Sequence, residues 1–599
     1  MTTTRHPSRP PQRRAARPTA KPAARSRARR QPSVRRRLSA VLLVTMMLMS
    51  LIAARLVQLQ GVDRATYAAA ASAQRLHTVT LTATRGTITD RSGNPLAETV
   101  DARDVVADPS VITDPAKVAA ALAPVLQIKA AKLEPELSGQ GQYARLAASV
   151  PPSEGDAVDA LDLAGISTPD ASRRIYPDGA LASNVVGFVG ASGQGLGGLE
   201  LAYQSQLAGH NGVAHYEVGA NGAPIPDGKD VVSAARSGEG LRLTLQRDIQ
   251  FEAQQAIAAQ VKATHALSGT VIVMNPRNGQ ILALAVAPTF DPNNLAKASA
   301  ADLGDPAVGD AYEPGSVIKT VTVSAALQNG LVTPNSKFVI PNTYNYGGST
   351  FHDAESHGTE HLTLTGILAY SSNIGAIQVA KRLGDQRLYD YLHAFGFGQP
   401  TGVGLPGESS GVLLPVDQWS ATTLPTLAFG QGLSVTAMQV ASLYSTIANN
   451  GVRVTPNIIE GTVGADGRFK HAAAPARREV ISAGVATKMR QILESVTTNE
   501  GTAPAARIDG YRIAGKTGTA NRPNGHGGYS GAGYDASFVG MVPADDPKLV
   551  CAVLLERPVR GYFGGLVAAP VFKTVMSFAL RTLHIAPTFT KPAKAKLTW

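Results

Sequence analysis

One serine and one lysine in the middle of the chain have the spacing that nucleophilic catalysis needs. Ser316 follows Pro314-Gly315, which breaks the preceding structure, and Lys319 comes three residues later. The apolar pattern predicts a helix that opens at Ser316, so both side chains would share one helical face. A serine hydroxyl needs a nearby base, and a lysine serves only when burial or a second cation lowers its pKa. An isolated S-x-x-K spacing is usually a helix cap beside a solvated lysine, so this interpretation needs companions.

Two companion motifs follow in order along the chain. Ser371-Ser372-Asn373 is an S-x-N motif, which is weak alone because Ser92-Gly93-Asn94 also fits it. Lys516-Thr517-Gly518-Thr519 contains the only K-T-G, at the predicted end of a short apolar strand. A second ammonium at Lys516 would lower the pKa of Lys319 and could anchor a substrate carboxylate. The three motifs together predict acyl transfer through a covalent seryl intermediate.

Other candidate motifs favour structural interpretations. The segment "FHDAESHGTEH" holds four possible zinc ligands, but without H-E-x-x-H spacing it predicts a polar loop near the cleft. A G-x-G-x-x-G pattern, with Glu217 about 20 residues later, matches a dinucleotide-binding fingerprint, yet no βαβ alternation follows it. Cys551 lies in an apolar run and is expected in the core. The residues of the first two patterns are His352, Asp353, His357 and His361, and Gly193, Gly195 and Gly198.

The elements around these motifs mix strands and helices. Alternating patterns predict hairpins around 90–94, around 278–279 and between "DASFVGMVP" and "KLVCAVLLE". Helical spacing predicts short helices over 112–165, a strand leading into a helix over "LRLTLQRDIQFEAQQAIAAQVKA", and a helix over "AAPVFKTVMSFALRTL". The Gly-, Asp- and Ser-rich residues 218–240 predict a module boundary or a long surface loop. A sheet with flanking helices in this mixed order predicts an α+β fold.

The charge and the cysteine content of the 599 residues narrow the function classes. One cysteine excludes an intrachain disulfide framework and any multi-cysteine metal site. The net charge of +12 suggests nucleic-acid binding, but residues 1–37 hold thirteen Lys and Arg and no acidic residue. The remaining chain has 43 basic against 44 acidic side chains. The basic charge therefore belongs to a tail, which is expected to be disordered, and nucleic acid is not an expected partner.

A membrane anchor is predicted directly after the tail. Arg35-Arg36-Arg37 is followed by Leu38–Ala54, seventeen residues without a charge. This is near the short limit for a membrane-spanning helix, and the flanking arginines predict a cytoplasmic N-terminus and an extracytoplasmic main portion. A cleaved signal peptide is the alternative, but the basic leader and the apolar run are long for one.

With these motifs in place, the chain resembles the class B penicillin-binding proteins, and more narrowly the septal peptidoglycan D,D-transpeptidases of cell division. The resemblance extends through "ARLVQLQ", "RGTITDRSGNPLA", "RIYPDGALASNVVGFVG", "GLGGLELAYQSQLAG" and "FGQGLSVT". It implies four parts: a disordered tail (1–37), a transmembrane anchor (38–58), an elongated, mostly β pedestal of the dimerisation type (60–225) and a transpeptidase domain (226–590). The last would have a central antiparallel sheet flanked by helices. Arg85, Asp90 and Glu200 would be structural ion-pair residues.

The resemblance also implies the roles of the motif residues. Ser316 would attack the penultimate D-Ala carbonyl of a nascent peptidoglycan stem pentapeptide, and Lys319 would take its proton. The N–H groups of Ser316 and Thr519 would form the oxyanion hole. β-Lactams mimic D-Ala-D-Ala and would leave Ser316 acylated; no metal or other cofactor is implied. The remaining residues are Ser371 and Lys516 for proton relay, and Asn373, Thr517, Gly518 and Thr519 for substrate binding.

Several alternatives stay open at this point. The chain could be a membrane-bound β-lactamase or penicillin sensor, a D,D-carboxypeptidase, or mainly a scaffold that activates a glycan polymerase. A lateral-wall role is also compatible with the motifs. No glycosyltransferase domain is recognisable before residue 225, so the resemblance implies a partner polymerase of the SEDS type in the cytoplasmic membrane, together with other membrane proteins of the division machinery.

Overall fold

The computed structural model describes residues 33–218, 224–526, 528–592 and 594–599. Most of the tail predicted over 1–37 therefore lies outside the described residues. The chain divides into two compact units, Met1–Val79 with Ala214–Asp230, and Thr80–Val213 with Val231–Trp599. The second unit holds all three of the motifs around Ser316, Ser371 and Lys516.

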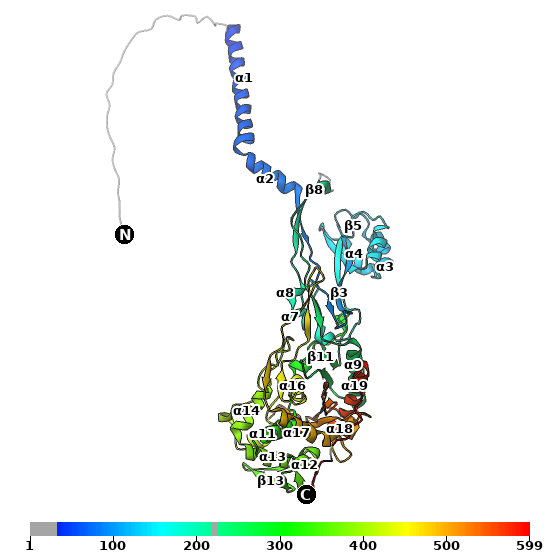
Figure 1. Cartoon of the computed structure of the whole chain (residues 1–599). Helices are drawn as coiled ribbons and strands as arrows, with labels where there is room; N and C mark the ends of the chain where they lie inside the picture. The colour runs from blue at the N-terminus through cyan, green and yellow to red at the C-terminus, as the bar shows by residue number, and fades with distance from the viewer. Residues whose placement is uncertain (1–32, 219–223, 527, 593) are drawn as a thin grey trace, which may run out of the picture. The chain divides into compact units, whose positions relative to one another are not determined.

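A long apolar helix dominates the first unit. Helix α1 (Val34–Val57) continues without a break into the π-helical turn η1 (Gln58–Val62), and α2 (Arg64–Arg75) follows (Figure 1). Residues 34–62 form the one helix in the described part of the chain that is long and apolar enough to cross a membrane. The helix starts before the predicted Leu38 because Arg35–Arg37 are good helix formers and continue its first turn.

Three strands form a narrow sheet in the order β1-β7-β8. They are β1 (Leu76–Leu81), β7 (Gly212–Val218) and β8 (Pro224–Ser233). The stretch 218–240, predicted as a boundary or surface loop, therefore contains a strand, because main-chain pairing with β7 does not require apolar side chains. Residues 219–223 of that stretch lie outside the described residues.

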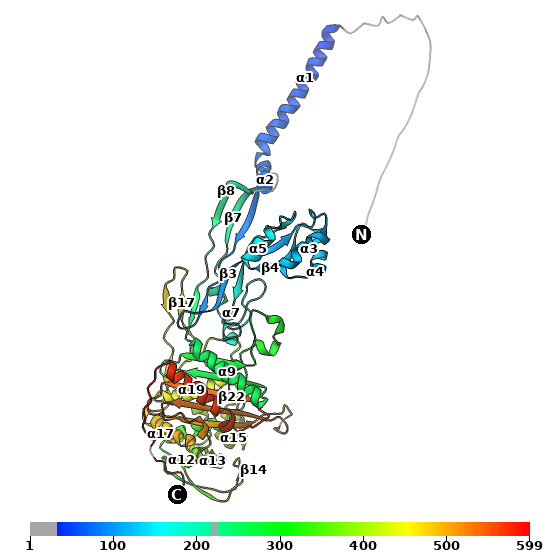
Figure 2. The same cartoon turned by 90° about the vertical axis from the view of Figure 1, so that its right-hand side faces the viewer.

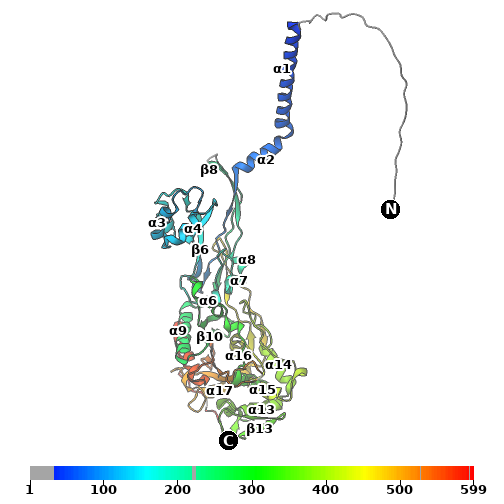
Figure 3. The same cartoon turned by 180° about the vertical axis from the view of Figure 1, so that it is seen from behind.

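The N-terminal part of the second unit is a sheet with a small helical layer. Strands β2 (Ile88–Thr89) and β3 (Pro95–Ala107) form the predicted hairpin, and β3 also pairs with β4 (Ala144–Val150), β5 (Ile166–Ser167) and β6 (Asp170–Ile175). The short helices predicted over 112–165 are α3 (Pro115–Leu126), α4 (Ala130–Leu137) and α5 (Pro152–Asp159), and α3 and α4 lie together in Figure 3. Leu122, Leu133 and Leu146 belong to their shared core.

Two of the three predicted ion-pair residues of this region pair as expected. Glu200, fully buried in α7 (Gly198–Ala202), accepts from Arg85 Nε at 2.6 Å and from Arg174 Nε at 2.7 Å. The prediction for Asp90 was wrong: its carboxylate accepts from the N–H groups of Ser92 and Asn94 and closes the β2–β3 turn. Short polar side chains often bond their own turn in this way, which sequence alone does not separate from pairing.

The glycine pattern beside Glu200 serves close packing of the backbone. A Cβ at Gly195 would lie 1.9 Å from the Glu200 carbonyl oxygen, and one at Gly198 would lie 2.4 Å from that of Val185. The segment contains only α6 (Ser183–Val186), α7 and α8 (Gln204–Leu207), with no βαβ unit in this described stretch. The dinucleotide-binding interpretation has no structural support.

A five-stranded antiparallel sheet forms the centre of the C-terminal part. Its order is β11-β10-β22-β21-β20, so β20 is an edge strand. The two predicted hairpins are β10–β11 and β21–β22. The strands are β10 (Ser268–Met274), β11 (Ile281–Ala287), β20 (Ala514–Asn521), β21 (Tyr534–Val542) and β22 (Leu549–Glu556).

Both faces of this sheet are buried by helices. Helices α9 (Arg247–Thr264) and α19 (Ala569–Thr582) cover one face, as Figure 2 shows, and both were predicted. Val271 and Val273 face this layer, whereas Ile272 and Met274 belong to the larger core on the opposite face, as the period of a strand requires. That core includes α11 (Lys319–Gln328), α13 (Asn373–Leu383), α16 (Ala437–Ala448) and α17 (Ala483–Glu494).

The remaining elements are small. The larger sheet that contains β2 and β3 extends to β9 (Gly240–Leu243), β17 (Ile459–Val463) and β18 (Phe469–His471). Two-stranded ribbons are β12 (Lys337–Ile340) with β15 (Glu360–Thr363), β13 (Thr343–Tyr346) with β14 (Ser349–His352), and β16 (Val452–Val454) with β19 (Arg477–Glu479). Further helices are α12 (Leu364–Ala369), α14 (Asp385–Phe395), α15 (Thr423–Ala428) and α18 (Gly564–Val567).

Candidate active site

Ser316 lies in a 3-10 turn immediately before helix α11. The turn η4 spans Gly315–Ile318, and the α-helix begins only at Lys319. The prediction that the helix opens at Ser316 was therefore wrong by one turn. Gly315 causes the difference, because it has φ +58° and donates its N–H to the Gly430 carbonyl at 2.9 Å, which redirects the chain before the helix starts.

The S-x-N motif forms the connection between helices α12 and α13. Ser372 caps α13, and its Oγ accepts from the N–H of Gly375 at 2.9 Å. Ser371, which precedes the cap, has the left-handed value φ +61°. This conformation is costly for a residue with a side chain, so the surrounding contacts must hold it.

The K-T-G motif lies inside strand β20. The strand runs from Ala514 to Asn521, and Lys516 pairs with Val539 of β21. The motif therefore lies in the middle of the strand rather than at its predicted end. Gly518 permits β20 to approach the turn Gly315–Ile318, which carries Ser316 and is called the nucleophile turn below. A Cβ at Gly518 would lie 2.3 Å from Ser537 Oγ and 3.0 Å from the Pro314 carbonyl oxygen.

Two buried ammonium groups converge on Ser371. Lys516 Nζ donates to Ser371 Oγ at 2.9 Å, and Lys319 Nζ donates to the Ser371 carbonyl oxygen at 2.5 Å and to Ser371 Oγ at 3.3 Å. Lys319 also donates to Asn373 Oδ1 at 2.7 Å. The three motifs, which are far apart in sequence, thus meet through direct side-chain bonds.

Burial changes the protonation of both lysines. Removal from water lowers the pKa of Lys319 to about 7, although the carboxylate of Asp353 acts in the opposite direction. Burial lowers the pKa of Lys516 well below its usual range, and the charge of Lys319 lowers it further. A neutral amine is thus available near neutral pH, as a serine nucleophile requires. The sequence pattern left burial and a second cation open as causes of a lowered pKa of Lys319, and burial is the cause that lowers it.

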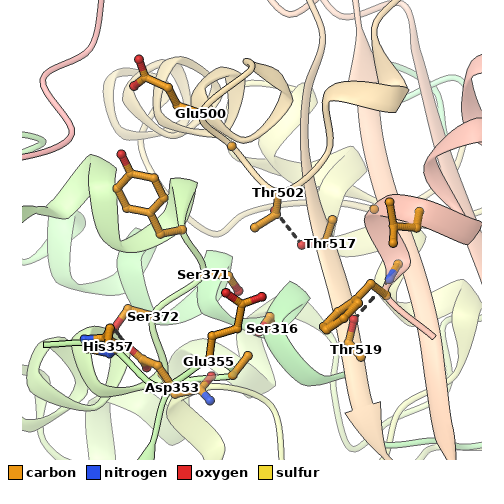
Figure 4. Close-up of a pocket in the computed structure, with 18 of the residues that line it drawn as sticks. Ser316, Asp353, Glu355, His357, Ser371, Ser372, Glu500, Thr502, Thr517 and Thr519 are labelled. Carbon is orange, nitrogen blue, oxygen red and sulfur yellow. Dashed lines mark hydrogen bonds and ion pairs between the residues drawn. The ribbon is translucent and has the colours of Figure 1, made fainter. Parts of the chain in front are cut away.

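A cavity of about 500 Å³ opens over these groups. Figure 4 shows Ser316 between Ser371 on one side and Thr517 and Thr519 of β20 on the other. The threonines are fixed by neighbours, since Thr517 Oγ1 lies 2.9 Å from Thr502 Oγ1 and Thr519 Oγ1 accepts from the Gly564 N–H at 3.2 Å. As an edge strand, β20 also has backbone groups that an extended peptide can pair with.

The structure therefore brings all eight predicted site residues into one region. Cys551 is buried in β22, which raises the pKa of its thiol. No group of three or more His, Cys, Asp or Glu in the described part of the chain could hold a metal ion. The segment 351–361, predicted as a polar loop near the cleft, forms a loop at 353–359 between β14 and β15, and part of it does lie at the cleft.

Sequence reasoning missed several residues that hold the site in place. Gly430 sets the nucleophile turn, Thr502 and Gly564 fix the threonines of β20, and Asp353 bonds to the S-x-N turn. The sequence pattern placed Asp353 in a polar loop near the cleft or, less favourably, in a zinc site, and not as a partner of the S-x-N turn. None of these residues has a fixed spacing to a motif, so no pattern could identify them.

Comparisons with known proteins agree with this geometry. Residues 269–577 match the penicillin-binding protein transpeptidase domain, and residues 80–243 match the penicillin-binding protein dimerisation domain. The chain is 37% identical over 572 residues to penicillin-binding protein PbpB of Mycobacterium tuberculosis (90% of this chain, 84% of that protein). It is 33% identical over 512 residues to the peptidoglycan D,D-transpeptidase FtsI of Escherichia coli (84% of each).

A solved structure gives the same result. The crystal structure of penicillin-binding protein 3 from Mycobacterium tuberculosis in complex with aztreonam matches with a TM-score of 0.70 and 34% identity. The match covers 87% of this chain and all of that chain. The likeness therefore extends over both the N-terminal and the C-terminal parts of the fold.

Proposed function

Because the chain belongs to the class B penicillin-binding proteins, we propose that it is a peptidoglycan D,D-transpeptidase of septal wall synthesis and a target of β-lactams, with Ser316 as the acyl carrier. The observation that carries this proposal is the convergence of Lys319 and Lys516 on Ser371 at the floor of the Ser316 cleft. The peptidoglycan transpeptidases among its relatives and the aztreonam complex support the reaction and the inhibitor class.

The reaction starts with proton removal from Ser316. Neutral Lys319 takes the proton while Ser316 Oγ attacks the carbonyl carbon of the penultimate D-Ala. In the described part of the chain Lys319 Nζ donates to Ser371 and Asn373 and makes no hydrogen bond to Ser316. A small rotation of the lysine on substrate binding must therefore precede the attack, as is common for catalytic contacts in unliganded enzymes.

Collapse of the tetrahedral intermediate gives the acyl-enzyme. The backbone N–H groups of Ser316 and Thr519 stabilise the oxyanion. The Lys516–Ser371 pair passes a proton to the nitrogen of the departing D-Ala as the peptide bond breaks. The amine of a neighbouring stem peptide then attacks the ester, the new amide crosslink forms, and Ser316 recovers its proton.

Substrate binding uses the edge of β20 and the turn opposite it. An extended stem peptide pairs with the β20 backbone, Asn373 holds the donor amide, and Thr517 and Thr519 hold the terminal carboxylate across Gly518. The hydroxyl of Thr517 lies next to the Lys516 amine, whose Nζ is 3.3 Å from Thr517 Oγ1, so both groups can donate hydrogen bonds to a carboxylate. This arrangement favours an anionic chain end at that position.

The protein is anchored in the membrane through α1. We place the N-terminus in the cytoplasm and the catalytic domain outside, because Arg35, Arg36 and Arg37 lie at the start of the helix. We also propose the four parts predicted from the sequence, with boundaries at 1–37, 38–58, 60–225 and 226–590. The partners that follow are nascent peptidoglycan, a SEDS-type glycan polymerase and other division proteins of the membrane.

A ligation assay tests this function. The full chain in detergent is incubated with a peptide thioester donor that ends in a D-Ala mimic and with a D-amino acid as acceptor. The proposal predicts a ligated peptide, blocked by penicillin and absent with Ser316→Ala. Hydrolysis of the donor without ligation would indicate a carboxypeptidase, and rapid turnover of penicillin would indicate a β-lactamase. Normal septation of cells that carry only Ser316→Ala would favour the scaffold role.

A further inference from the structure

The loop between β14 and β15 binds the S-x-N turn at three consecutive residues. Asp353 Oδ2 accepts from Ser372 Oγ at 2.7 Å, and Asp353 Oδ1 accepts from the Ile374 N–H at 2.9 Å. The carbonyl oxygen of the preceding residue, His352, accepts from Asn373 Nδ2 at 3.0 Å. In Figure 4 Asp353 lies beside Ser372 and His357, on the same side of Ser316 as Ser371. The loop thus holds the turn from the side of the cleft.

These bonds explain how Ser371 keeps an unfavourable conformation. Ser371 has φ +61° and presents its hydroxyl to Lys516 and its carbonyl to Lys319. A left-handed residue with a side chain relaxes unless its neighbours are fixed. Because Asp353 fixes the two positions that flank Asn373, the turn cannot relax while both carboxylate oxygens stay bonded.

A histidine lies against the same carboxylate. His357 Nε2 is 3.2 Å from Asp353 Oδ2, and His357 Nδ1 is 2.6 Å from the Gly358 carbonyl oxygen. Both ring nitrogens therefore face acceptors, and only the imidazolium can donate to both. The side chains of His357 and Asp353 are 15% and 10% exposed, so the ion pair is mostly shielded from water.

We propose that Asp353, paired with His357, is a positioning residue for the Ser316 reaction: it clamps the Ser371–Asn373 turn and sets the charge that Lys319 experiences. The proposal rests on the proposed function, since its effect is measured as acylation of Ser316. The polar loop that the sequence placed near the cleft would then hold the Ser371–Asn373 turn in place for the Ser316 reaction.

The protonation states agree with this arrangement. The Asp353 carboxylate raises the pKa of Lys319 against the effect of burial. Burial lowers the pKa of His357, but the Gly358 carbonyl and the charges of Glu360 and Asp353 outweigh it and raise the pKa above the usual 6.5. The charged groups that raise the pKa of His357 are Asp353 and Glu360. Asp353 in turn raises the pKa of Lys319, which lies on α11.

The pH dependence of acylation tests the proposal. The second-order rate of labelling by a fluorescent penicillin is measured from pH 5 to 9 on the full chain in detergent. For the parent protein we expect a rise through about pH 7, as Lys319 becomes neutral, and a fall above the raised pKa of His357. Asp353→Asn should lower the optimum rate about tenfold to a hundredfold, because the amide keeps only one of the two acceptor oxygens that bind Ser372 and Ile374. It should also move the rising limb to lower pH.

The shift of the rising limb separates a positioning role from a merely structural one. Damage to the fold lowers the rate equally at every pH, whereas loss of the Asp353 charge lowers the pKa of Lys319. Asp353→Glu keeps the charge, so its rate should fall while its rising limb stays near that of the parent. His357→Gln should abolish the fall at high pH. Asp466→Asn, which alters an exposed carboxylate paired with Arg468 in another part of the domain, is the matched control and should change nothing.

Two results would overturn the proposal. One is an unchanged rate for Asp353→Asn, and the other is a lowered rate with the rising limb at the parental pH. Ser316→Ala in the same assay distinguishes a failure of the proposed function from a failure of the proposed role of Asp353. Labelling that persists in Ser316→Ala would refute the proposed function itself, whereas its loss beside an unaffected Asp353→Asn would refute only the role of Asp353.

Discussion

Two ammonium groups reach one hydroxyl in the cleft, from helix α11 and from strand β20. Lys319 and Lys516 are both fully buried, although lysine is among the residues least often found inside a protein. Their bonds to Ser371 and Asn373 offset only part of the free energy lost when an ammonium leaves water. The two buried lysines therefore make the site less stable than an apolar core would be. The same burial that costs stability keeps an amine neutral for catalysis.

Replacement of Lys516 should show this cost directly. Lys516→Met should abolish acylation and raise the free energy of unfolding at pH 6.5 by about 1 kcal/mol or more. In the folded parent Lys516 has a lowered pKa, so between that pKa and 10.5 the unfolded chain binds the additional proton, and parental stability rises with pH. The advantage of the variant over the parent should therefore shrink at pH 9.5. Urea unfolding at pH 6.5 and pH 9.5 measures the difference in the free energy of unfolding between the variant and the parent. If that difference is the same at the two pH values, burial of Lys516 does not carry the expected cost.

The residues of the site divide into those that the sequence could predict and those that it could not. That Ser316, Lys319 and Lys516 lie in one region was predictable, because each belongs to a motif with one residue type at a fixed spacing. Asp353 and His357 act on the site from a loop whose distance along the chain has no fixed value. Their contacts with Ser372 depend on how β14 and β15 place that loop, which is a tertiary property.

At the scale of elements, the nucleophile turn is shaped by the segment behind it. Gly430 has φ +90°, and a Cβ there would lie 2.0 Å from the carbonyl oxygen of Gly315. The same residue accepts the N–H of Gly315. The "FGQGLSVT" segment thus acts as the back wall of the turn that carries Ser316.

A single methyl group at this wall should disable the site without unfolding the domain. Gly430→Ala should displace Gly315 and Ser316 and lower penicillin acylation by about a hundredfold, since small displacements of reacting groups have effects of that order. Gly467→Ala is the matched control, because Gly467 has a similar φ of +75° but no atom within 4 Å of the position that a Cβ would occupy. The control carries the backbone strain alone, so equal losses of acylation rate in the two variants would contradict the role of the wall.

The C-terminal residues support the ribbon that carries the Asp353 loop. Trp599 donates its indole N–H to the Leu362 carbonyl at 3.2 Å, its ring meets His361 edge-on at 4.8 Å, and Lys337 Nζ lies 4.5 Å from its centre. Thr598 forms a bridge with Leu362. The chain end is therefore joined to both β12 and β15.

Removal of this indole should loosen the ribbon. Trp599→Ala should lower the free energy of unfolding by about 1–2 kcal/mol, through lost aromatic contact and hydrogen bonding, and should speed amide exchange over 337–363. Phe589→Ala, at a side chain that is 78% exposed in the same C-terminal segment, should change both measurements little. Equal exchange rates over 337–363 in the parent and in Trp599→Ala would show that the C-terminal residues do not support this ribbon.

Elements with strong periodic patterns were predicted well, and those set by long-range contacts were not. The β10–β11 and β21–β22 hairpins and helices α9 and α19 follow directly from apolar spacing and turn residues. The start of α11 was misplaced because its first turn is set by Gly430, more than a hundred residues away. Strand β8 was missed because the Gly-, Asp- and Ser-rich stretch that contains it lacks the apolar alternation by which a strand is predicted.

At the scale of the whole molecule, a buried ion triad joins distant segments of the second unit. Glu200 is fully buried between Arg85, which precedes β2, and Arg174 of β6. None of these three residues lines the catalytic cavity. The triad therefore supports the domain that presents the catalytic part, and the sequence resemblance had identified two of its three members.

Neutralising Glu200 should affect stability and leave the chemistry intact. Glu200→Gln leaves two buried guanidinium groups without a counter-charge, so the free energy of unfolding should fall by about 3–5 kcal/mol. The rate of penicillin acylation at 25 °C should match that of the parent as long as the protein is folded. Asp170→Asn removes the 91%-exposed partner of Arg103 in the same region and should cost less than about 1 kcal/mol. A thermal unfolding series compares the three proteins, and equal losses of stability in the two variants would refute the importance of the triad.

Ser316 is proposed to carry the acyl group, and intact-mass analysis with peptide mapping can show directly which residue is acylated. The full chain in detergent is incubated with penicillin, its mass is measured over time, and the adduct is located by proteolysis and fragmentation. We expect one penicilloyl group per chain on Ser316, stable for many minutes and absent from Ser316→Ala. An adduct on another residue, or a parent protein that stays unmodified under conditions where its fold is intact, would contradict it.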